Sequence, residues 1–262
     1  MTGSAATTAA TRSARVTAVT SGKGGVGKTF VSANLAAALS ARGERVLVLD
    51  ADLGLANLDV ALNLEPRVTL HDVIGGRAEL DAALTAAPGG FTVLPAGSGL
   101  LEYSRLTADV RDRLLQVVAE LRPRFDRVLL DTGAGISDVV LYTIALADEV
   151  LVVVTPEPTS MTDAYAAVKV LATTQQRRRL RLLVNQCGPG SNGRQVCAQL
   201  QRVVSRYVDP AVGATVTLDL LGEVPVDPAV REAVLRRELL LEVYPGCPAA
   251  RALVAAAARM SR

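Results

Sequence analysis

Residues 15–29 have the sequence RVTAVTSGKGGVGKT and carry the strongest structural signal in the chain. The β-branched run 15–21 predicts a strand, and it leads directly into the motif G-x-x-x-x-G-K-[ST] at Gly22–Thr29. A helical pattern follows over 28–42. In this context the glycines let backbone N–H groups turn inward around a phosphate, and the helix N-terminus adds partial positive charge. The stretch therefore predicts a phosphate-binding loop, or P-loop.

Two lysines lie within this loop, and they are expected to have different roles. Lys28 would reach the β- and γ-phosphates of a nucleotide, and the Thr29 hydroxyl would ligate Mg²⁺. Lys23 places a second cation near the phosphates, where the geometry does not need another one from the same chain. It is either a solvated loop lysine or a lysine that crosses a dimer interface to the partner's nucleotide. The backbone groups around the phosphates would come from Gly22, Lys23, Gly24, Gly25, Val26 and Gly27.

The rest of the chain alternates short Val/Leu-rich runs with longer helical patterns. The expected strands cover 15–21, 45–50, 91–95, 127–131, 149–155, 180–185 and 216–224. The expected helices lie near 28–42, 107–122, 138–147, 159–173, 192–207, 228–237 and 248–260. The pattern predicts a single doubly wound α/β domain with a mostly parallel sheet, whose ligands bind at the carboxyl ends of the strands. The least regular region, 51–90, is expected to cap one edge.

Carboxylates follow two of the expected strands at the point where each strand ends. Strand 45–50 ends at Asp50, with Asp52 two residues later, and strand 127–131 ends at Asp131, followed by Gly133. One carboxylate beside the P-loop can hold Mg²⁺, and another beyond the γ-phosphate can orient the attacking water. Gly133 would bring a backbone N–H onto the γ-phosphate. An aspartate at a strand end is often a plain turn residue, but the combination with the P-loop predicts a nucleotide-hydrolysis site.

Composition excludes several other classes of protein. Half of the 262 residues are hydrophobic, so the body of the chain can bury a core and is not disordered. The 28 basic and 26 acidic residues give no global attraction to nucleic acid. One histidine and three scattered cysteines, without C-x-x-C spacing, do not make a zinc or iron–sulfur site. Residues 1–14 are expected to form a flexible lead-in to one domain over 15–262.

The P-loop and the two aspartate-bearing segments resemble the MinD/ParA family of deviant Walker ATPases. The resemblance covers nearly the whole chain from Arg15, and the lysine that opens KGGVGKT, residues 23–29, is typical of that family. Three further strings resemble its FlhG (FleN) branch, the flagellar-number regulators. They are DADLGLANLD at 50–59, DTGAGIS at 131–137 and TPEPTSMTDAY at 155–165.

The resemblance implies a role for each site residue. Lys28 and Thr29 would bind phosphate and Mg²⁺, and Asp50 and Asp131 would assist at the metal. Lys23 would complete the neighbouring subunit's site in an ATP-sandwich homodimer, and Asp52 would position the hydrolytic water. Asn185 matches the family's adenine-contacting asparagine, and Pro225 to Asp227 match its second base-contacting loop.

The resemblance also implies slow ATP hydrolysis that resets a dimeric signalling state. The partner would be a flagellar transcription activator or the GTPase that places flagella, in the cytoplasm or at the inner face of the membrane. Three alternatives remain open: a ParA-like partitioning ATPase acting on DNA or protein clusters, a MinD-like division-site ATPase, and a largely non-catalytic nucleotide-gated scaffold.

Two further segments have competing interpretations. The basic run Arg177, Arg178, Arg179 and Arg181 is expected to be a solvated helix end rather than a patch for DNA or an acidic partner. The final stretch 249–260 consists mainly of small residues, without the bulky face of a strong interfacial helix. Packing onto the sheet is therefore favoured over reversible membrane contact.

Overall fold

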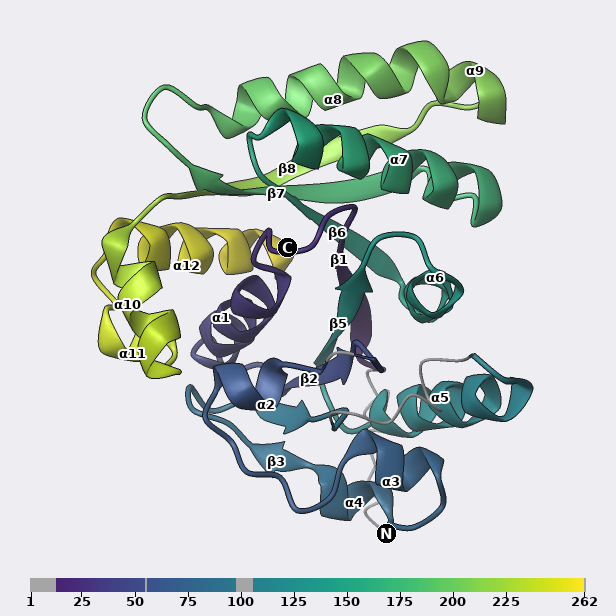
Figure 1. The fold of residues 1–262 in the computed structure, drawn as a ribbon, viewed down its shortest axis with the longest axis vertical. Coiled ribbons are helices and arrows are strands. Elements are labelled where there is room, and N and C mark those ends of the chain that lie inside the picture. Colours follow the sequence, from purple (N-terminus) through teal and green to yellow (C-terminus); the bar gives the residue numbers. More distant parts are fainter. Residues whose placement is uncertain (1–12, 55, 98–105, 262) are drawn as a thin grey trace, which may run out of the picture.

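The computed structural model describes residues 13–54, 56–97 and 106–261, and a single sheet lies at the centre of this part of the chain (Figure 1). Its strands are β1 (Arg15–Ser21), β2 (Val46–Ala51), β3 (Thr85–Ala86), β4 (Thr92–Leu94), β5 (Arg127–Ala134), β6 (Glu149–Val154), β7 (Arg179–Cys187) and β8 (Thr217–Pro225). Their order in the sheet is β3-β4-β2-β5-β1-β6-β7-β8. Strands β3 and β4 are antiparallel, and all other neighbours are parallel.

Helices connect the strands and cover both faces of the sheet (Figure 1). The longer ones are α1 (Lys28–Ser40), α5 (Ala108–Leu121), α6 (Asp138–Ala145), α7 (Pro158–Thr174), α8 (Gly193–Tyr207), α10 (Pro228–Arg236) and α12 (Pro248–Met260). Short helices are α2 (Leu58–Ala61), α3 (Leu70–Ile74), α4 (Leu80–Ala83), α9 (Asp209–Val212) and α11 (Leu240–Val243). The predicted doubly wound, mostly parallel α/β fold is confirmed.

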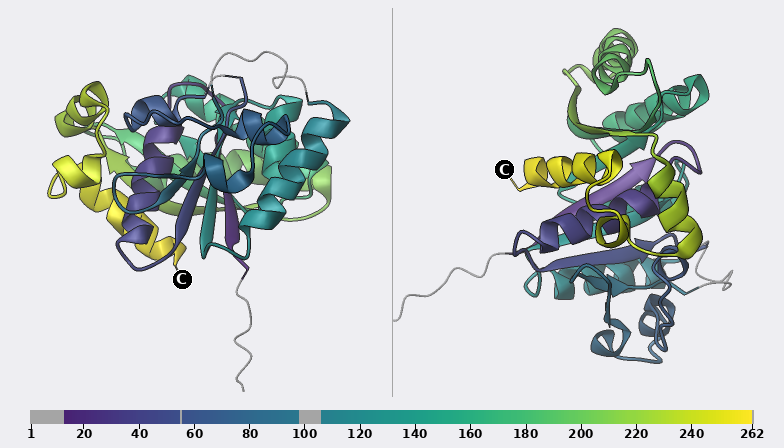
Figure 2. Two further views of the ribbon diagram at one scale, coloured as in Figure 1. Left: turned by 90° about the horizontal axis from the view of Figure 1, so that it is seen from below. Right: turned by 90° about the vertical axis from the view of Figure 1, so that its left-hand side faces the viewer.

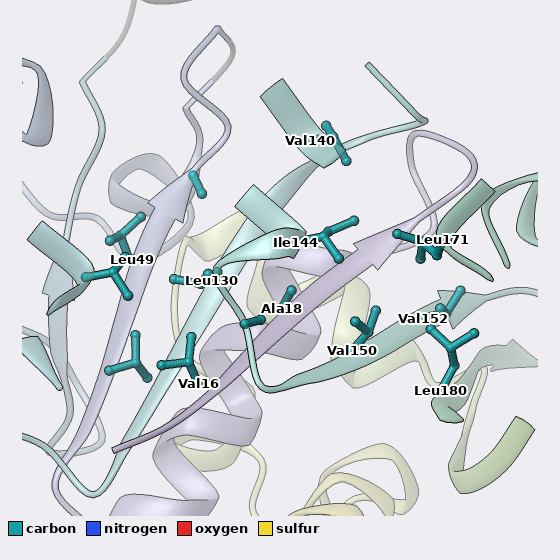
Figure 3. Close-up of a cluster of buried hydrophobic side chains, with 14 of the residues drawn as sticks. Val16, Ala18, Leu49, Leu130, Val140, Ile144, Val150, Val152, Leu171 and Leu180 are labelled. Carbon is teal, nitrogen blue, oxygen red and sulfur yellow. The ribbon is translucent and has the colours of Figure 1, made fainter. Parts of the chain in front are cut away.

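The two faces of the sheet carry separate hydrophobic cores, because successive side chains of a strand point to opposite faces. In β2, Leu47 and Leu49 join the core under α5, α6, α7 and α8, whereas Val46 and Val48 join the core under α1 and α12. Burial on both faces explains why the strands are continuously apolar in sequence. Figure 3 shows part of the first core, with labelled side chains from five strands and two helices: Val16, Ala18, Leu49, Leu130, Val140, Ile144, Val150, Val152, Leu171 and Leu180.

Region 51–90 departs from the simple alternation, as its irregular sequence predicts. It forms α2, α3 and α4, and then β3, which pairs with β4 and ends the sheet. The two-residue strand β3 was not predicted, because a pair of residues has no periodicity to detect. Of the expected lead-in 1–14, residues 1–12 lie outside the described residues. Ala14 is buried and donates its backbone N–H to the Arg122 carbonyl at 2.7 Å.

Helix α12 packs into the body of the domain, as the small residues of its sequence predict. Figure 2 shows it (yellow) lying beside α1 (purple), and its side chains Leu253, Ala256 and Met260 are fully buried. Its small residues allow this close approach, since Ala256 comes within 3.3 Å of the position that a Cβ on Gly222 of β8 would take. No described helix combines the length and the hydrophobicity that a membrane crossing requires.

Candidate phosphate-binding site

The P-loop joins β1 to α1 at the carboxyl edge of the sheet, where its backbone conformation depends on glycine. Gly25 and Gly27 have φ angles of 76° and 91°, in the left-handed region that other residues rarely adopt. A Cβ on Gly22 would lie 2.1 Å from the Asp163 carbonyl oxygen, so α7 leaves no room for a side chain there. The loop borders a cavity of about 580 Å³, together with the segments that follow β2 and β5. The motif thus forms the predicted strand–loop–helix cradle.

Three charged side chains meet at this edge, two of them buried and the third, Lys28, half-buried. Asp50 of β2 and Asp131 of β5 occupy paired positions in the sheet, and their exposed fractions are 1% and 3%. Burial raises the pKa of Asp50 to about 8, with a further contribution from the nearby Asp131 carboxylate. Burial likewise raises the pKa of Asp131 to about 6, against hydrogen bonds from Thr29 and Ser32. Burial also lowers the pKa of Lys28, although Asp131 and Asp52 oppose this shift. Two buried carboxylates therefore lie close to one half-buried lysine.

This donor set fits a divalent cation. Carboxylates and hydroxyls are hard oxygen ligands, and a cation would stabilise the ionised form of both aspartates, which burial disfavours. Asp131 accepts hydrogen bonds from the hydroxyl of Thr29 and, at 3.0 Å, from that of Ser32. Within the described residues no group of three or more His, Cys, Asp and Glu side chains is arranged to hold a metal. Nucleotide phosphates and water would therefore have to complete the coordination shell, as is usual for Mg²⁺.

Asp52 and Gly133 lie together in the wall of the cavity. A Cβ on Gly133 would come within 3.4 Å of the Asp52 carboxyl group, so the two residues are neighbours. Both line the cavity, and the Asp52 backbone N–H donates to Asp50 Oδ1 at 3.1 Å. The structure brings together Lys28, Thr29, Asp50, Asp52, Asp131 and Gly133, as the sequence predicts.

Lys23 points toward α7 and not along the cavity. Its Nζ lies 2.9 Å from Glu157 Oε2 and donates to Thr159 Oγ1 at 3.0 Å. The ion pair is exposed, with 38% of the Lys23 side chain and 61% of the Glu157 side chain accessible. Lys23 is thus separated from Lys28 although the two belong to one loop.

Asn185 and the Pro225–Asp227 loop lie behind the P-loop, at the ends of β7 and β8. Asn185 is buried and donates its Nδ2 to the Val26 carbonyl at 2.8 Å, so it supports the P-loop backbone. The same amide lies 2.5 Å from the position that a Cβ on Gly27 would take. The carboxylate of Asp227 accepts backbone N–H groups at the starts of α10 and α12.

Sequence reasoning missed two residues of the site, Ser32 and Asn57. Ser32 lies three residues after Thr29 on α1, which places both hydroxyls on one helix face toward Asp131. The three-residue spacing of these hydroxyls could have identified Ser32 from the sequence. Asn57 precedes α2, and its backbone N–H, like that of Leu58, donates to Asp50 Oδ2 at 3.1 Å. This contact depends on a turn after β2 that no sequence period reveals.

Comparison with known proteins agrees with this geometry. Residues 17–241 match the model of the CobQ/CobB/MinD/ParA nucleotide binding domain. The chain belongs to this family. It is 44% identical over 246 residues to the antiactivator FleN of Pseudomonas aeruginosa, covering 94% of this chain and 86% of FleN. It is also 33% identical over 230 residues to the flagellum site-determining protein YlxH of Helicobacter pylori, covering 87% of this chain and 75% of YlxH.

A solved family structure shows a similar fold with a nucleotide bound. The septum site-determining protein MinD of Pyrococcus horikoshii, complexed with Mg-ADP, matches with a TM-score of 0.75 and 27% identity. The match covers 95% of this chain and 96% of that one. The chain is therefore a MinD/ParA-family nucleotide-binding domain with homology to flagellar regulators of the FleN type.

Proposed function

We propose that this protein is an ATP-hydrolysing switch that dimerises with ATP and regulates flagellar number or placement. The observation that carries the ATPase part is the buried cluster at the P-loop, where Asp50 and Asp131 outnumber Lys28. Such a cluster is costly in a folded protein unless a ligand of matching charge binds to it. The flagellar part is supported by the 44% identity to FleN.

The proposal assigns ATP and Mg²⁺ to the cavity between the P-loop and the ends of β2 and β5. Backbone N–H groups of the P-loop and the Lys28 ammonium would hold the phosphates. Thr29 would ligate the metal, with Asp50 and Asp131 holding it directly or through water. When bound, Mg²⁺ would neutralise charge on the β- and γ-phosphates.

Hydrolysis is assigned to Asp52, which would orient water on the far side of the γ-phosphate. The position of Asp52 in the lining of the same cavity as Lys28 supports this assignment. Gly133, next to Asp52, would present its backbone N–H to the γ-phosphate. The reaction is expected to be slow, as the resemblance to the MinD/ParA family implies.

Dimerisation is assigned to Lys23, which would leave Glu157 and complete the nucleotide site of a second copy. Its exposure at the rim of the P-loop supports this role, since the side chain can reorient without breaking a core contact. The dimer would bind a flagellar transcription activator or placement GTPase in the cytoplasm. Residues 15–262 would act as one domain in this switch.

The proposal is tested by counting flagella by electron microscopy in a deletion strain and in a strain carrying Asp52→Ala. Deletion is expected to raise the number of flagella, and Asp52→Ala to change it differently because ATP-bound dimer accumulates. Purified Asp52→Ala should bind ATP with normal affinity, lose turnover and become a dimer with ATP and Mg²⁺ in light scattering. Unchanged flagellar counts in both strains would refute the flagellar assignment, and a monomeric Asp52→Ala with ATP would refute the switch.

A further inference from the structure

The loop Pro225–Asp227 is fastened to α12 through one carboxylate. Asp227 Oδ1 accepts the Ala229 N–H at 3.0 Å at the start of α10, and Oδ2 accepts the Ala249 N–H at 3.2 Å at the start of α12. Burial pushes the pKa of Asp227 upward, but the amides of Ala249 and Ala229 outweigh burial and hold it below the ordinary value. The ionised carboxylate therefore caps two helices at once.

Cys247 adds a second contact at the same junction. It is the N-cap of α12, where its Sγ accepts the Ala250 N–H at 3.4 Å, and its thiol also hydrogen-bonds Asp227. Burial raises the pKa of this thiol, and Asp227 raises it further, so Cys247 keeps its proton and acts as a donor to the carboxylate. The start of α12 is thus held to Asp227 by a backbone amide and a side chain.

On its other side, the loop is linked to the P-loop. The Val226 N–H donates to the Cys187 carbonyl at 3.0 Å, at the end of β7. Two residues earlier in β7, Asn185 donates to the Val26 carbonyl of the P-loop at 2.8 Å. Hydrogen bonds and the covalent backbone between them therefore connect the P-loop through β7 and the Pro225–Asp227 loop to α12.

The far end of α12 is also fixed, at a strand that leads to the charged cluster. Arg127, at the start of β5, donates its Nη2 to the Met260 carbonyl at 3.1 Å, and β5 continues to Asp131. Between its ends α12 lies along α1, which begins at Lys28 (Figure 2). Helix α12 therefore spans from the Pro225–Asp227 loop to β5 and behaves as a brace for the site.

We propose that Asp227 is a positioning residue: it holds the Pro225–Val226 loop in place for the nucleotide base by anchoring that loop to α12, and does not contact the base itself. This inference rests on the proposed ATP site, with the base against the ends of β7 and β8. Each carboxylate oxygen accepts an amide at the start of a helix, which directs the carboxylate toward α10 and α12, and the neighbouring loop backbone would contact the base. Binding of a base and ordering of α12 are then coupled, and each strengthens the other.

The test compares Asp227→Ser with Asp227→Ala, using ADP and inorganic pyrophosphate as probes in calorimetry. Serine is a good N-cap, so it keeps the bond to Ala229 but is too short to reach Ala249. Both variants should bind ADP about tenfold more weakly, the usual effect of losing one such bond, and should bind pyrophosphate normally. Normal ADP affinity in Asp227→Ser would overturn the proposal, because the α10 cap alone would then suffice. Equal losses of affinity for ADP and pyrophosphate would also overturn the proposal, because they would indicate a general effect on the fold.

Hydrogen exchange supplies a readout of the coupling itself. ADP should increase the protection of α12 amides in the natural protein and in Cys247→Ser, which keeps both an N-cap acceptor and a donor. It should not do so in Asp227→Ser. Equal ADP-induced protection in Asp227→Ser would overturn the inference alone. A natural protein that binds neither ADP nor pyrophosphate would overturn the proposed ATP site together with the inference.

Discussion

The cluster around Lys28, Asp50 and Asp131 and the basic run Arg177–Arg181 are both conspicuous in the sequence, yet the fold neutralises their charges differently. In the cluster, burial raises the pKa values of the two buried carboxylates and lowers the pKa of the half-buried lysine. In the basic run each guanidinium has a partner within the chain. The comparison shows that unmatched buried charge, rather than density of charge along the sequence, marks the ligand site.

The partners of the basic run are specific. Arg177 donates to the Ile144 and Ala147 carbonyls at 2.9 and 2.7 Å, at the end of α6. Arg178 donates to the Ala172 carbonyl at 2.7 Å, near the end of α7. The two others form ion pairs from β7: Arg179 with Asp219, and Arg181 with Glu149. Cations at helix C-termini complement exposed carbonyls, so the fold itself accounts for this run.

The largest effect is expected from Lys28→Ala, which should weaken ADP binding by about two to three orders of magnitude. The buried phosphates would lose their only cation from the P-loop interior. The fold should survive, because Asp50 has a pKa of about 8 and can stay protonated, and loss of the Lys28 ammonium lets the pKa of Asp131 rise further. Calorimetry gives the affinity, and Lys169→Ala, at an exposed position of α7, is the matched control. Similar ADP affinities for Lys28→Ala and Lys169→Ala would contradict the inference that the charged cluster marks the ligand site.

Stability of the nucleotide-free protein should depend on pH through the same cluster. Asp50 and Asp131 have pKa values of about 8 and 6 in the folded chain, whereas their ordinary value is 3.8. Between pH 4 and 8 the folded state therefore binds more protons than the unfolded state, and the free energy of unfolding should fall by several kcal/mol as pH rises. Urea unfolding at several pH values measures this slope. Asp131→Asn should flatten it, and an unchanged slope would locate the titrating groups elsewhere.

Much of this site follows from sequence, and the rest depends on contacts that sequence does not encode locally. The P-loop and the aspartates at strand ends are local patterns, and a parallel sheet brings their carboxyl ends to one edge. The strands were predicted to within a few residues because Val/Leu runs persist where both faces are buried. The contact of Lys23 with Glu157 and the double cap by Asp227 join residues far apart in the chain. Only packing of α7 and α12 creates them.

An intermediate effect is expected from the exposed pair Lys23–Glu157. Glu157→Gln removes the charge that holds Lys23 against α7, so ATP-dependent dimers should form at a several-fold lower protein concentration. Lys23→Ala should bind ADP but fail to dimerise with ATP. Light scattering across a concentration series separates these outcomes. If Glu157→Gln dimerises like the natural protein, the ion pair does not restrain Lys23.

The smallest effects are expected from substitutions in the basic run, and they decide whether the run is structural or binds a ligand. Arg177→Ala removes the donor to the Ile144 and Ala147 carbonyls at the end of α6. Urea unfolding should show a loss of stability of about 1 kcal/mol. Arg179→Ala breaks only an exposed pair with Asp219 and should leave the urea midpoint unchanged. Neither variant should alter retention on duplex DNA with ATP and Mg²⁺, because both side chains serve intramolecular contacts. If Arg179→Ala abolished salt-sensitive DNA retention without changing stability, the basic run would be a ligand-binding surface. Pairing of a charge within the chain would then not distinguish a structural residue from a ligand-binding one.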